Sequence, residues 1–559
     1  MSADERGWAE DVAPRCEGTW ASASEVPEHQ AGFPSSAPIR VHLRLLLLTA
    51  LLLAGAASAA QPDAETLYQQ HCAACHGADR LGGQGPALLP QNLSRLRRDA
   101  AARSIAEGVA ATQMPAFGEQ LTGSEIQALV DLIYTPLDHV PEWGAEQIRA
   151  SRIVHEENLG LPDRPVFDAD PMNVFFVVEK GDHHATVLDG DTFEPIHRLP
   201  TRYALHGGPK YSPDGRFIHM VSRDGWVTRY DLWNLKAVAE VRVGINTRNI
   251  AVSADGRYLM AANYLPHTLV LLATETLELV QVIPVMDDHG ASSRVSAVYT
   301  APPRHSFIAA LKDLKEVWEI PYSNQAEALP VYTGVMHDYR ADSGEDPLVD
   351  PRRFPVRRIK VDDYLDDFFF DPGYRHLVGA SRDGGGQVVN LTVGRTIEEI
   401  DLPGLPHLGS GITWRRDGKW IMATPNLKEA AVSVIDTADW SVIERIDTLG
   451  PGFFMRSHPD TPYLWTDVFF GPHRDALHVI DKQTLEIVRT LRPAPGKTAA
   501  HVEFTRDGSH ALVSIWEDDG ALVVYDADTL EEVKRLPMRK PSGKYNVWNK
   551  ISYSRGTSH

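Results

Sequence analysis

The stretch YSPDGRFIHMVSRDGWVTRYDL at residues 211–232 decides the fold. It contains an Asp-Gly turn, an apolar strand, a polar gap and an alternating strand that ends in Asp. Alternation with a period of two between Asp-Gly turns predicts antiparallel β-strands. Similar stretches recur at residues 252–279, 414–440 and 504–533. One such unit has too little apolar surface to bury alone, so stacked copies are favoured over independent sandwiches.

Weaker copies of this unit complete the repeat; they lie at residues 172–196, 300–320, 370–391 and 457–487. Eight copies with a period of roughly 40–45 residues predict an all-β eight-bladed propeller. The C-terminal stretch GKYNVWNKI, residues 543–551, is expected to join the first blade and close the ring. Residues 330–365 interrupt the period and predict a long loop over one face.

The composition excludes several classes of protein. The chain has 559 residues, of which 43% are hydrophobic and 23% charged, so it is neither collagen-like nor wholly disordered. A formal net charge of −20 without a basic stripe argues against a nucleic-acid partner. Three cysteines cannot build a disulfide framework, and two of them stand in one motif, which points to redox or cofactor chemistry.

That motif is LYQQHCAACHGAD, with Cys72, Cys75 and His76 in the C-x-x-C-H pattern of covalent haem attachment. Two thiols one helical turn apart can add to the two haem vinyl groups, and the adjoining His then becomes an axial ligand of the iron. A thioredoxin-like pair would need a βαβ pattern, and a zinc site would need a second pair of ligands. The motif therefore predicts one covalently bound haem c.

Residues 61–139 are interpreted as a small all-α class I cytochrome c domain. The Met-Pro-x-Phe context of Met114 and the pair Gly85-Pro86 resemble the small cytochrome c family. The resemblance implies that Met114 is the second axial ligand and that the Pro86 carbonyl orients His76. The alternative for Met114 is a flexible filler of the core.

The last segment of this domain predicts an amphipathic helix. Thr122 can cap its N-terminus, and Pro136 would end it. Its apolar face would carry Ile126, Leu129, Val130 and Ile133.

The N-terminus, residues 1–60, predicts export. Residues 42–60 follow Arg40 with an apolar run and a small-residue cleavage box, so the mature chain is expected to begin near Gln61. The run is shorter than the roughly 20 residues of a membrane anchor. Acidic residues and prolines in residues 1–39 suggest that translation starts near Val41. These features predict a periplasmic protein without a membrane anchor after cleavage.

An exported cytochrome c followed by an eight-bladed propeller resembles the cytochrome cd1 nitrite reductase family, whose propeller binds haem d1. Local strings match as well, at residues 203–217, 402–411 and 540–549. This resemblance makes His206 the fifth ligand of a non-covalent haem d1 and places His407 on the distal side. The domains implied are residues 61–139 for the cytochrome, 140–165 for a linker and 166–559 for the propeller.

Haem d1 carries several carboxylates, whose burial requires fixed cations and hydrogen-bond donors. The resemblance offers five such residues, each of which could instead be a surface charge or a core aromatic. They are Lys180, Arg223, Arg248, Tyr264 and Trp516.

One departure from the nitrite reductases concerns the chemistry. Their first distal histidine falls in YLDDFFFDPG, where Asp366 or a neighbour stands instead. An ionised Asp would repel nitrite rather than protonate it. The stretches PHLGSGITW and KPSGKYNVWNK look more like a sister group, the dihydro-haem d1 dehydrogenases of haem d1 biosynthesis, which serves denitrification. Those enzymes oxidise one propionate side chain of dihydro-haem d1 to an acrylate.

His501, in KTAAHVEFTRDG, matches the base position of that group, and its alternative is an exposed loop histidine. The resemblance also implies iron and haem c as electron sinks, a periplasmic acceptor such as a cytochrome c, and a nitrite reductase that receives haem d1. Two other functions stay open: nitrite reduction itself, and a carrier that holds haem d1 without transforming it.

Overall fold

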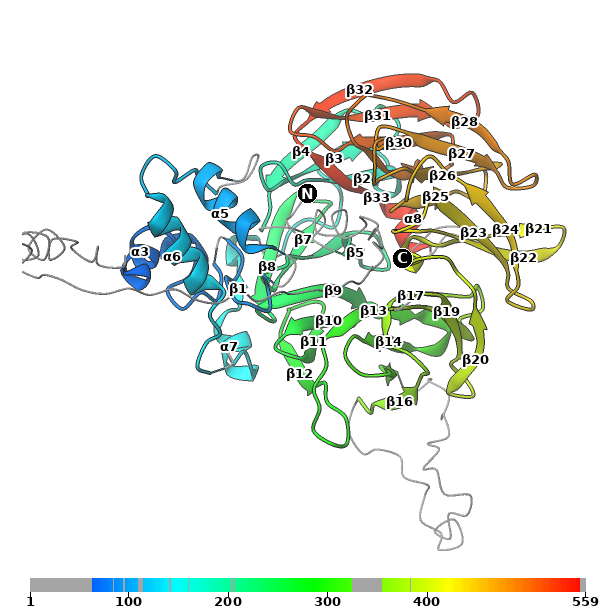
Figure 1. Ribbon diagram of the computed structural model, residues 1–559. Helices are drawn as coiled ribbons and strands as arrows, with labels where there is room; N and C mark the ends of the chain where they lie inside the picture. Colours follow the sequence, from blue (N-terminus) through cyan, green and yellow to red (C-terminus); the bar gives the residue numbers. More distant parts are fainter. Residues whose placement is uncertain are drawn as a thin grey trace, which may run out of the picture.

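Eight β-sheets arranged around one axis form most of the molecule, and a small helical domain lies beside them (Figure 1). The computed structural model describes residues 63–83, 85–93, 96–108, 114–139, 142–158, 160–202, 205, 207–323, 354–382 and 384–552. The proposed signal segment, the start site and His206 lie outside these residues. No helix within the described ranges is long and apolar enough to cross a membrane.

Each sheet is antiparallel and, with one exception, four-stranded. From the inner to the outer edge, the first two blades contain β33 (Pro541–Asn546), β2 (Val174–Glu179), β3 (His184–Asp189) and β4 (Pro195–Pro200), then β5 (Lys210–Tyr211), β6 (Phe217–Val221), β7 (Trp226–Asp231) and β8 (Lys236–Arg242). The third and fourth contain β9 (Asn246–Val252), β10 (Tyr258–Leu265), β11 (Thr268–Ala273) and β12 (Leu279–Pro284), then β13 (Val295–Ala301), β14 (Ser306–Leu311), β15 (Glu316–Pro321) and β16 (Arg357–Lys360).

The other four blades follow the same order. The fifth and sixth contain β17 (Leu365–Phe370), β18 (His376–Ser381), β19 (Gly386–Asn390) and β20 (Arg395–Ile400), then β21 (Ile412–Arg416), β22 (Lys419–Pro425), β23 (Ala431–Asp436) and β24 (Val442–Asp447). The seventh and eighth contain β25 (Met455–Ser457), β26 (Tyr463–Asp467), β27 (Leu477–Asp481) and β28 (Ile487–Leu491), then β29 (Ala499–Phe504), β30 (His510–Ile515), β31 (Gly520–Asp526) and β32 (Glu532–Met538). The predicted eight-bladed propeller is confirmed.

The first blade closes the ring with a strand from the other end of the chain, as predicted. Strand β33 pairs with β2, so that Asn546 stands opposite Phe175. The short helix α8 (Val547–Ile551) follows and lies near the centre of the ring (Figure 1). This pairing completes the four-stranded sheet of the first blade and closes the ring.

Apolar residues between neighbouring blades form the core. On β2 all six residues are buried, and successive side chains point to opposite faces. Phe175 therefore packs with Leu512 and Leu522 of the eighth blade, while Phe176 packs with Ile218 of the second. Each blade is buried on both faces, which explains the near-continuous apolar runs in the inner strands.

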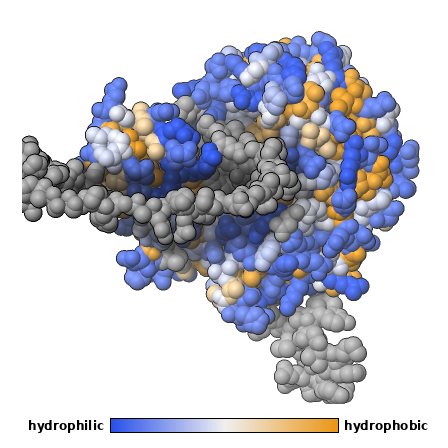
Figure 2. Space-filling view, in the orientation of Figure 1, coloured by the Kyte–Doolittle hydropathy of each residue, from blue (hydrophilic) through white to orange (hydrophobic). Residues whose placement is uncertain are grey.

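The outermost strands carry the apolar exceptions. Exposed aliphatic residues lie singly on β20, β24, β28 and β32, namely Ile397, Ile443, Val488 and Val533. Figure 2 shows hydrophilic residues over much of the cytochrome domain, with hydrophobic residues grouped on the blades at the upper right. Single exposed apolar residues of this kind are usual for a globular protein.

The helical domain contains α3 (Ala64–His71), α4 (Ala73–His76), α5 (Arg98–Glu107) and α6 (Gly123–Ile133). A capping box formed by Thr122 and Glu125 begins α6. The residues buried on α6 are Ile126, Leu129, Val130 and Ile133, the face predicted from the sequence.

Two segments differ from the sequence expectation. Within 140–165, α7 (Ala145–Ala150) buries Ile148 against the propeller core, and β1 (Ile153–Val154) pairs with β8 as a fifth strand of the second sheet. The segment is thus docked rather than a free linker. Within 330–365, residues 354–365 are described and include β16, which completes the fourth blade, so this part is not loop.

Candidate active site

The C-x-x-C-H motif lies at the start of α4, with Cys72 and Cys75 one turn apart. The buried ring of His76 approaches the carbonyl oxygen of Pro86 with Nδ1 at 2.8 Å. Donation from Nδ1–H to this carbonyl leaves Nε2 as the coordinating nitrogen, which fits the axial role of a haem ligand. Burial and the neighbouring Cys75 raise the pKa of Cys72 to about 11, which does not fit a reactive redox thiolate.

Two further residues surround this haem site. Gly85 lies against His76: a Cβ atom here would be 2.7 Å from Cε1 of His76, so the loop needs glycine for close approach. Met114 packs against the apolar core of the domain, and its role as second axial ligand stays a prediction.

A cavity opens at the centre of the propeller, with an empty volume of about 1230 Å³ including its solvent-open part. The lining includes predicted site residues from three blades and the loop before β21: Lys180, Arg248, His407, His501 and Trp516. His206 lies outside the described residues, although Leu205 and Gly207 beside it line the same cavity.

Three inner strands near the cavity contain backbone bulges. The pairing register shifts at Ser296 in β13, at Asp366 in β17 and at His501 in β29. His501 has a φ of +52°, a left-handed conformation that costs energy in a residue other than glycine. Bulges of this kind redirect a side chain without breaking the sheet.

The backbone of His501 is held from two sides. Its N–H donates to Oδ2 of Asp467 at 3.2 Å, and its carbonyl accepts from Nζ of the buried Lys544. Its ring lies between those of Phe454 and Tyr545, with centroids 4.8 and 5.5 Å away. Its Nδ1 is buried and, within the described residues, has no hydrogen-bond partner.

The charges around His501 favour its neutral form. Burial is the main cause that holds the pKa of His501 well below its usual range, and the cations of Lys544, Arg456 and Lys550 act in the same direction. The His501 side chain lines the cavity, and a neutral imidazole with an unsatisfied nitrogen can accept a proton. Trp516 also lines the cavity, and its buried Nε1 is equally unsatisfied among the described residues.

His407 is oriented differently. Its Nδ1 is 2.5 Å from the carbonyl oxygen of Phe453, and its Nε2 is 3.9 Å from Oδ2 of Asp367. Burial lowers the pKa of His407 below its ordinary value. Donation from Nδ1–H leaves Nε2 with a free lone pair, which suits an iron ligand.

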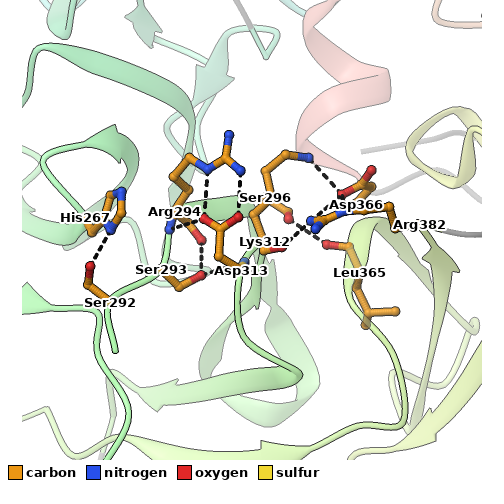
Figure 3. A network of polar contacts seen from close by, with 10 residues as sticks. All are labelled: His267, Ser292, Ser293, Arg294, Ser296, Lys312, Asp313, Leu365, Asp366 and Arg382. Atoms are coloured by element: carbon orange, nitrogen blue, oxygen red, sulfur yellow. Dashed lines mark hydrogen bonds and ion pairs between the residues drawn. The ribbon is translucent and has the colours of Figure 1, made fainter. Parts of the chain in front are cut away.

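The acid at the expected distal position is Asp367 rather than Asp366. Asp367 lines the cavity and accepts hydrogen bonds from the Gly409 N–H at 2.8 Å and the Tyr299 hydroxyl at 3.2 Å. Asp366 instead pairs with Lys312 at 2.8 Å and Arg382 at 3.1 Å (Figure 3). The bulge at Asp366 shifts the alternation by one residue, so the neighbouring carboxylate faces the cavity.

Arg223 and Tyr264 do not line the cavity. The Arg223 guanidinium lies 5.6 Å from the centre of the Tyr264 ring, and Arg294 lies at the same distance. Arg294 is in turn paired with Asp313 at 2.6 Å (Figure 3).

These cations share a position in the repeat with the cavity residues. Lys180, Arg223, Lys312, Arg382 and Trp516 each follow the second strand of their blade by one or two residues, and of these Lys180 and Trp516 line the cavity. Arg223 therefore shares a position in the repeat with cavity residues but is not part of the cavity wall.

A second set of cations was not predicted from the sequence. Arg456 and Lys550 line the cavity, and Arg456 forms a buried ion pair with Glu503 at 2.7 Å. Lys210 lies nearby, and burial together with Arg456 lowers the pKa of Lys210 to about 8. The residues that line the cavity thus include more basic side chains than carboxylates, which fits a ligand with several carboxylates. The available signal was the family-like stretch KPSGKYNVWNK, which ends at Lys550.

Comparison with known proteins gives the family. Residues 169–349 and 347–550 match the Cytochrome D1 heme domain, and residues 59–133 match Cytochrome C oxidase, cbb3-type, subunit III. The Dihydro-heme d1 dehydrogenase of Pseudomonas aeruginosa is 57% identical over 519 residues, covering 92% of this chain and 100% of that protein. A Nitrite reductase of Stutzerimonas stutzeri is 25% identical over 548 residues, covering 87% of this chain and 92% of that protein.

A solved structure is similar throughout. It is the dihydro-heme d1 dehydrogenase NirN in complex with DHE, with a TM-score of 0.80 and 57% identity, covering 87% of this chain and 99% of that one. A cytochrome c domain joined to a D1 heme propeller defines the cytochrome cd1 class of haem oxidoreductases. Within that class, this chain belongs to the dihydro-haem d1 dehydrogenase family.

Proposed function

We propose that this chain oxidises the propionate side chain of dihydro-haem d1 to the acrylate of haem d1, with His501 as the general base. It is then an oxidoreductase of haem d1 biosynthesis, as its relative's name states for that protein. The observation that carries the proposal is the buried, unsatisfied Nδ1 of a neutral His501 on a cation-lined cavity.

The reaction removes two protons and two electrons from two adjacent carbons. A carbon-bound hydrogen is very weakly acidic, so a base within hydrogen-bond reach is needed. His501 accepts one proton, and the second leaves to solvent. When bound, the iron tetrapyrrole and the haem c held by the C-x-x-C-H motif would supply the redox chemistry, and an external acceptor would take up the two electrons.

Other residues of the chain hold the substrate. Lys180, Arg248, Arg456 and Lys550 offset the charge of the buried carboxylates, and the Trp516 indole can cover an edge of the macrocycle. The Nζ atom of Lys180 lies 5.2 Å from the centre of the Trp516 ring, so a cation–π interaction joins these two side chains. His206 and His407 are the residues proposed to hold its iron.

Nitrite reduction is less well supported than dehydrogenation. Asp367, beside His407, presents a carboxylate where a nitrite reductase presents a proton-donating histidine, and this charge disfavours an anionic substrate. A pure carrier is also less well supported, because it has no use for an attached cytochrome.

The proposal includes a location and partners. Residues 42–60 support export to the periplasm through a cleaved signal peptide. There a small cytochrome c would accept the electrons, and the nitrite reductase would receive the finished haem d1.

The test is to incubate the purified holoprotein with dihydro-haem d1 and an oxidant and to follow the visible spectrum. Conversion to haem d1 by the wild type, with nitrite left unreduced, supports the proposal. Binding without conversion would favour the carrier.

A further inference from the structure

The cytochrome domain meets the propeller through the loop that orients its own haem ligand. Pro86, which accepts from His76, lies in the loop of residues 81–89. In the same loop Ala87 and Leu89 are buried against Ile245 and Leu265 of the propeller. The contact therefore reaches the haem c ligand within a few residues.

Arg242, at the end of β8, joins the two sides. Its guanidinium donates to the carbonyl oxygen of Leu81 in the loop and, through Nε at 2.8 Å, to the carbonyl oxygen of Asp224. The group is almost wholly buried and lies 4.5 Å above the ring of Trp143. A Cβ atom on Gly82, whose φ is +85°, would come within 3.2 Å of the same guanidinium, so the loop is seated closely on it.

The turn that accepts from Arg242 is also bonded to a strand of the cavity wall. Asp224 follows Arg223 in the β6–β7 turn, and the carbonyl oxygen of Arg223 accepts from Thr247, just ahead of Arg248 in the cavity wall. A single buried side chain thus connects the haem c loop to a turn next to the cavity wall.

We propose that Arg242 is a positioning residue that holds the cytochrome domain in one docked position on the propeller, called the seat below. This docked position would fix the path between the two haem groups. A buried guanidinium with two carbonyl acceptors is suited to this, because its planar fork fixes direction as well as distance. The seat itself does not depend on which residue is the catalytic base; only its consequence for electron transfer rests on the proposed function.

The test is hydrogen exchange in the full-length holoprotein without substrate, comparing the wild type with Arg242→Gln. Amides in residues 81–89 and 243–247 are expected to exchange roughly tenfold faster together, corresponding to ~1.4 kcal/mol. Residues 64–76 and the haem c spectrum should not change, since the bond from His76 to Pro86 lies within the cytochrome. Arg242→Lys, which retains one donor group without the fork, should give an intermediate rate.

Two further variants keep the test decisive. Ile245→Ala removes apolar contact from the same seat and should raise exchange in the same two segments, even if Arg242→Gln fails to fold. Arg304→Gln removes a buried guanidinium from the fourth blade, where it pairs with Glu319, and should leave residues 81–89 unchanged. Wild-type exchange in a folded Arg242→Gln variant would overturn the proposal, and if that variant fails to fold, wild-type exchange in Ile245→Ala would overturn it.

Electron transfer between the haem groups gives a functional readout. In Arg242→Gln, dihydro-haem d1 should bind as in the wild type, while reduction of haem c by bound substrate slows. Faster hydrogen exchange together with slower reduction of haem c supports the seat, whereas faster exchange with unaltered reduction would contradict its role in electron transfer. Loss of turnover in Arg242→Gln with wild-type hydrogen exchange would instead contradict the docking role of Arg242 and indicate an effect on the proton-transfer chemistry.

Discussion

The backbone N–H of His501 donates to Oδ2 of Asp467 at 3.2 Å, and the same carboxylate accepts the N–H groups of Phe453 and Phe454 through Oδ1 at 2.7 and 3.0 Å. One buried side chain of the seventh blade thereby fixes the proposed base of the eighth blade and the wall that faces it. The left-handed φ of His501 is sustained by this contact and by Lys544.

Asp467→Asn should lower turnover roughly tenfold or more, since a hydrogen bond to a charged group contributes about 1.5–3 kcal/mol. An amide has one acceptor oxygen for three N–H groups, so the His501 bulge loses a restraint. Steady-state kinetics and substrate titration check this: kcat should fall while binding of dihydro-haem d1 persists. Unchanged kcat would show that Asp467 does not position the base.

The pH profile should reflect a histidine with a lowered pKa. Because the pKa of His501 lies well below its usual value of 6.5, the neutral, active form persists to lower pH, and kcat/KM should fall only as the pH drops below 6.5. Burial raises the pKa of the facing Asp467 to about 6, so its protonation adds to the loss in the same acid range. An acid limb centred above pH 6.5 would contradict this assignment.

Lys544→Met should move that acid limb toward higher pH. Burial lowers the pKa of Lys544 well below its usual value, and in its protonated form Lys544 lowers the pKa of His501, so removing the ammonium raises the pKa of the imidazole. Lys534→Met is the matched control, because Lys534 pairs with Glu194 at the surface. Identical pH profiles for the two variants would show that the Lys544 charge does not reach His501.

Gly85→Ala should disturb haem c without touching the propeller. The added Cβ would be 2.7 Å from Cε1 of His76, so the ring has to shift, and the haem c reduction potential or haem incorporation should change. Gly123→Ala is the control, since a Cβ there meets nothing within 4 Å. Potentiometric titration of both variants checks this, and equal potentials would contradict the tight seat of His76.

Local patterns account for what the sequence predicted well. The Asp-Gly turns and alternating strands of the blades and the capped helix after Thr122 depend on residues close in sequence. The position of Asp367 could not be predicted in the same way, because a bulge at Asp366 changes which face the next residue takes. Sequence alternation carries no sign of a bulge one residue long.

Long-range contacts account for what was missed. Arg456 and Lys550 reach the cavity from the seventh blade and from α8. No pattern near Arg456 marks it as a binding group, and the family-like stretch that ends at Lys550 does not single out that residue. Arg223 was assigned by its match to a family, yet it is not part of the cavity wall, and Tyr264 is its neighbour. Residues 140–165 were predicted to be a linker because their composition is mostly polar. That composition gives no sign that Ile148 packs into the propeller core.

The turnover of His501→Ala tests the central claim most directly. A general base contributes on the order of 10²–10⁴-fold, so conversion of dihydro-haem d1 should slow by about that factor. Binding of the substrate and both haem spectra should stay as in the wild type, because the cation lining, His407 and the C-x-x-C-H motif are untouched. Conversion at the wild-type rate by His501→Ala would contradict the assignment of His501 as the base.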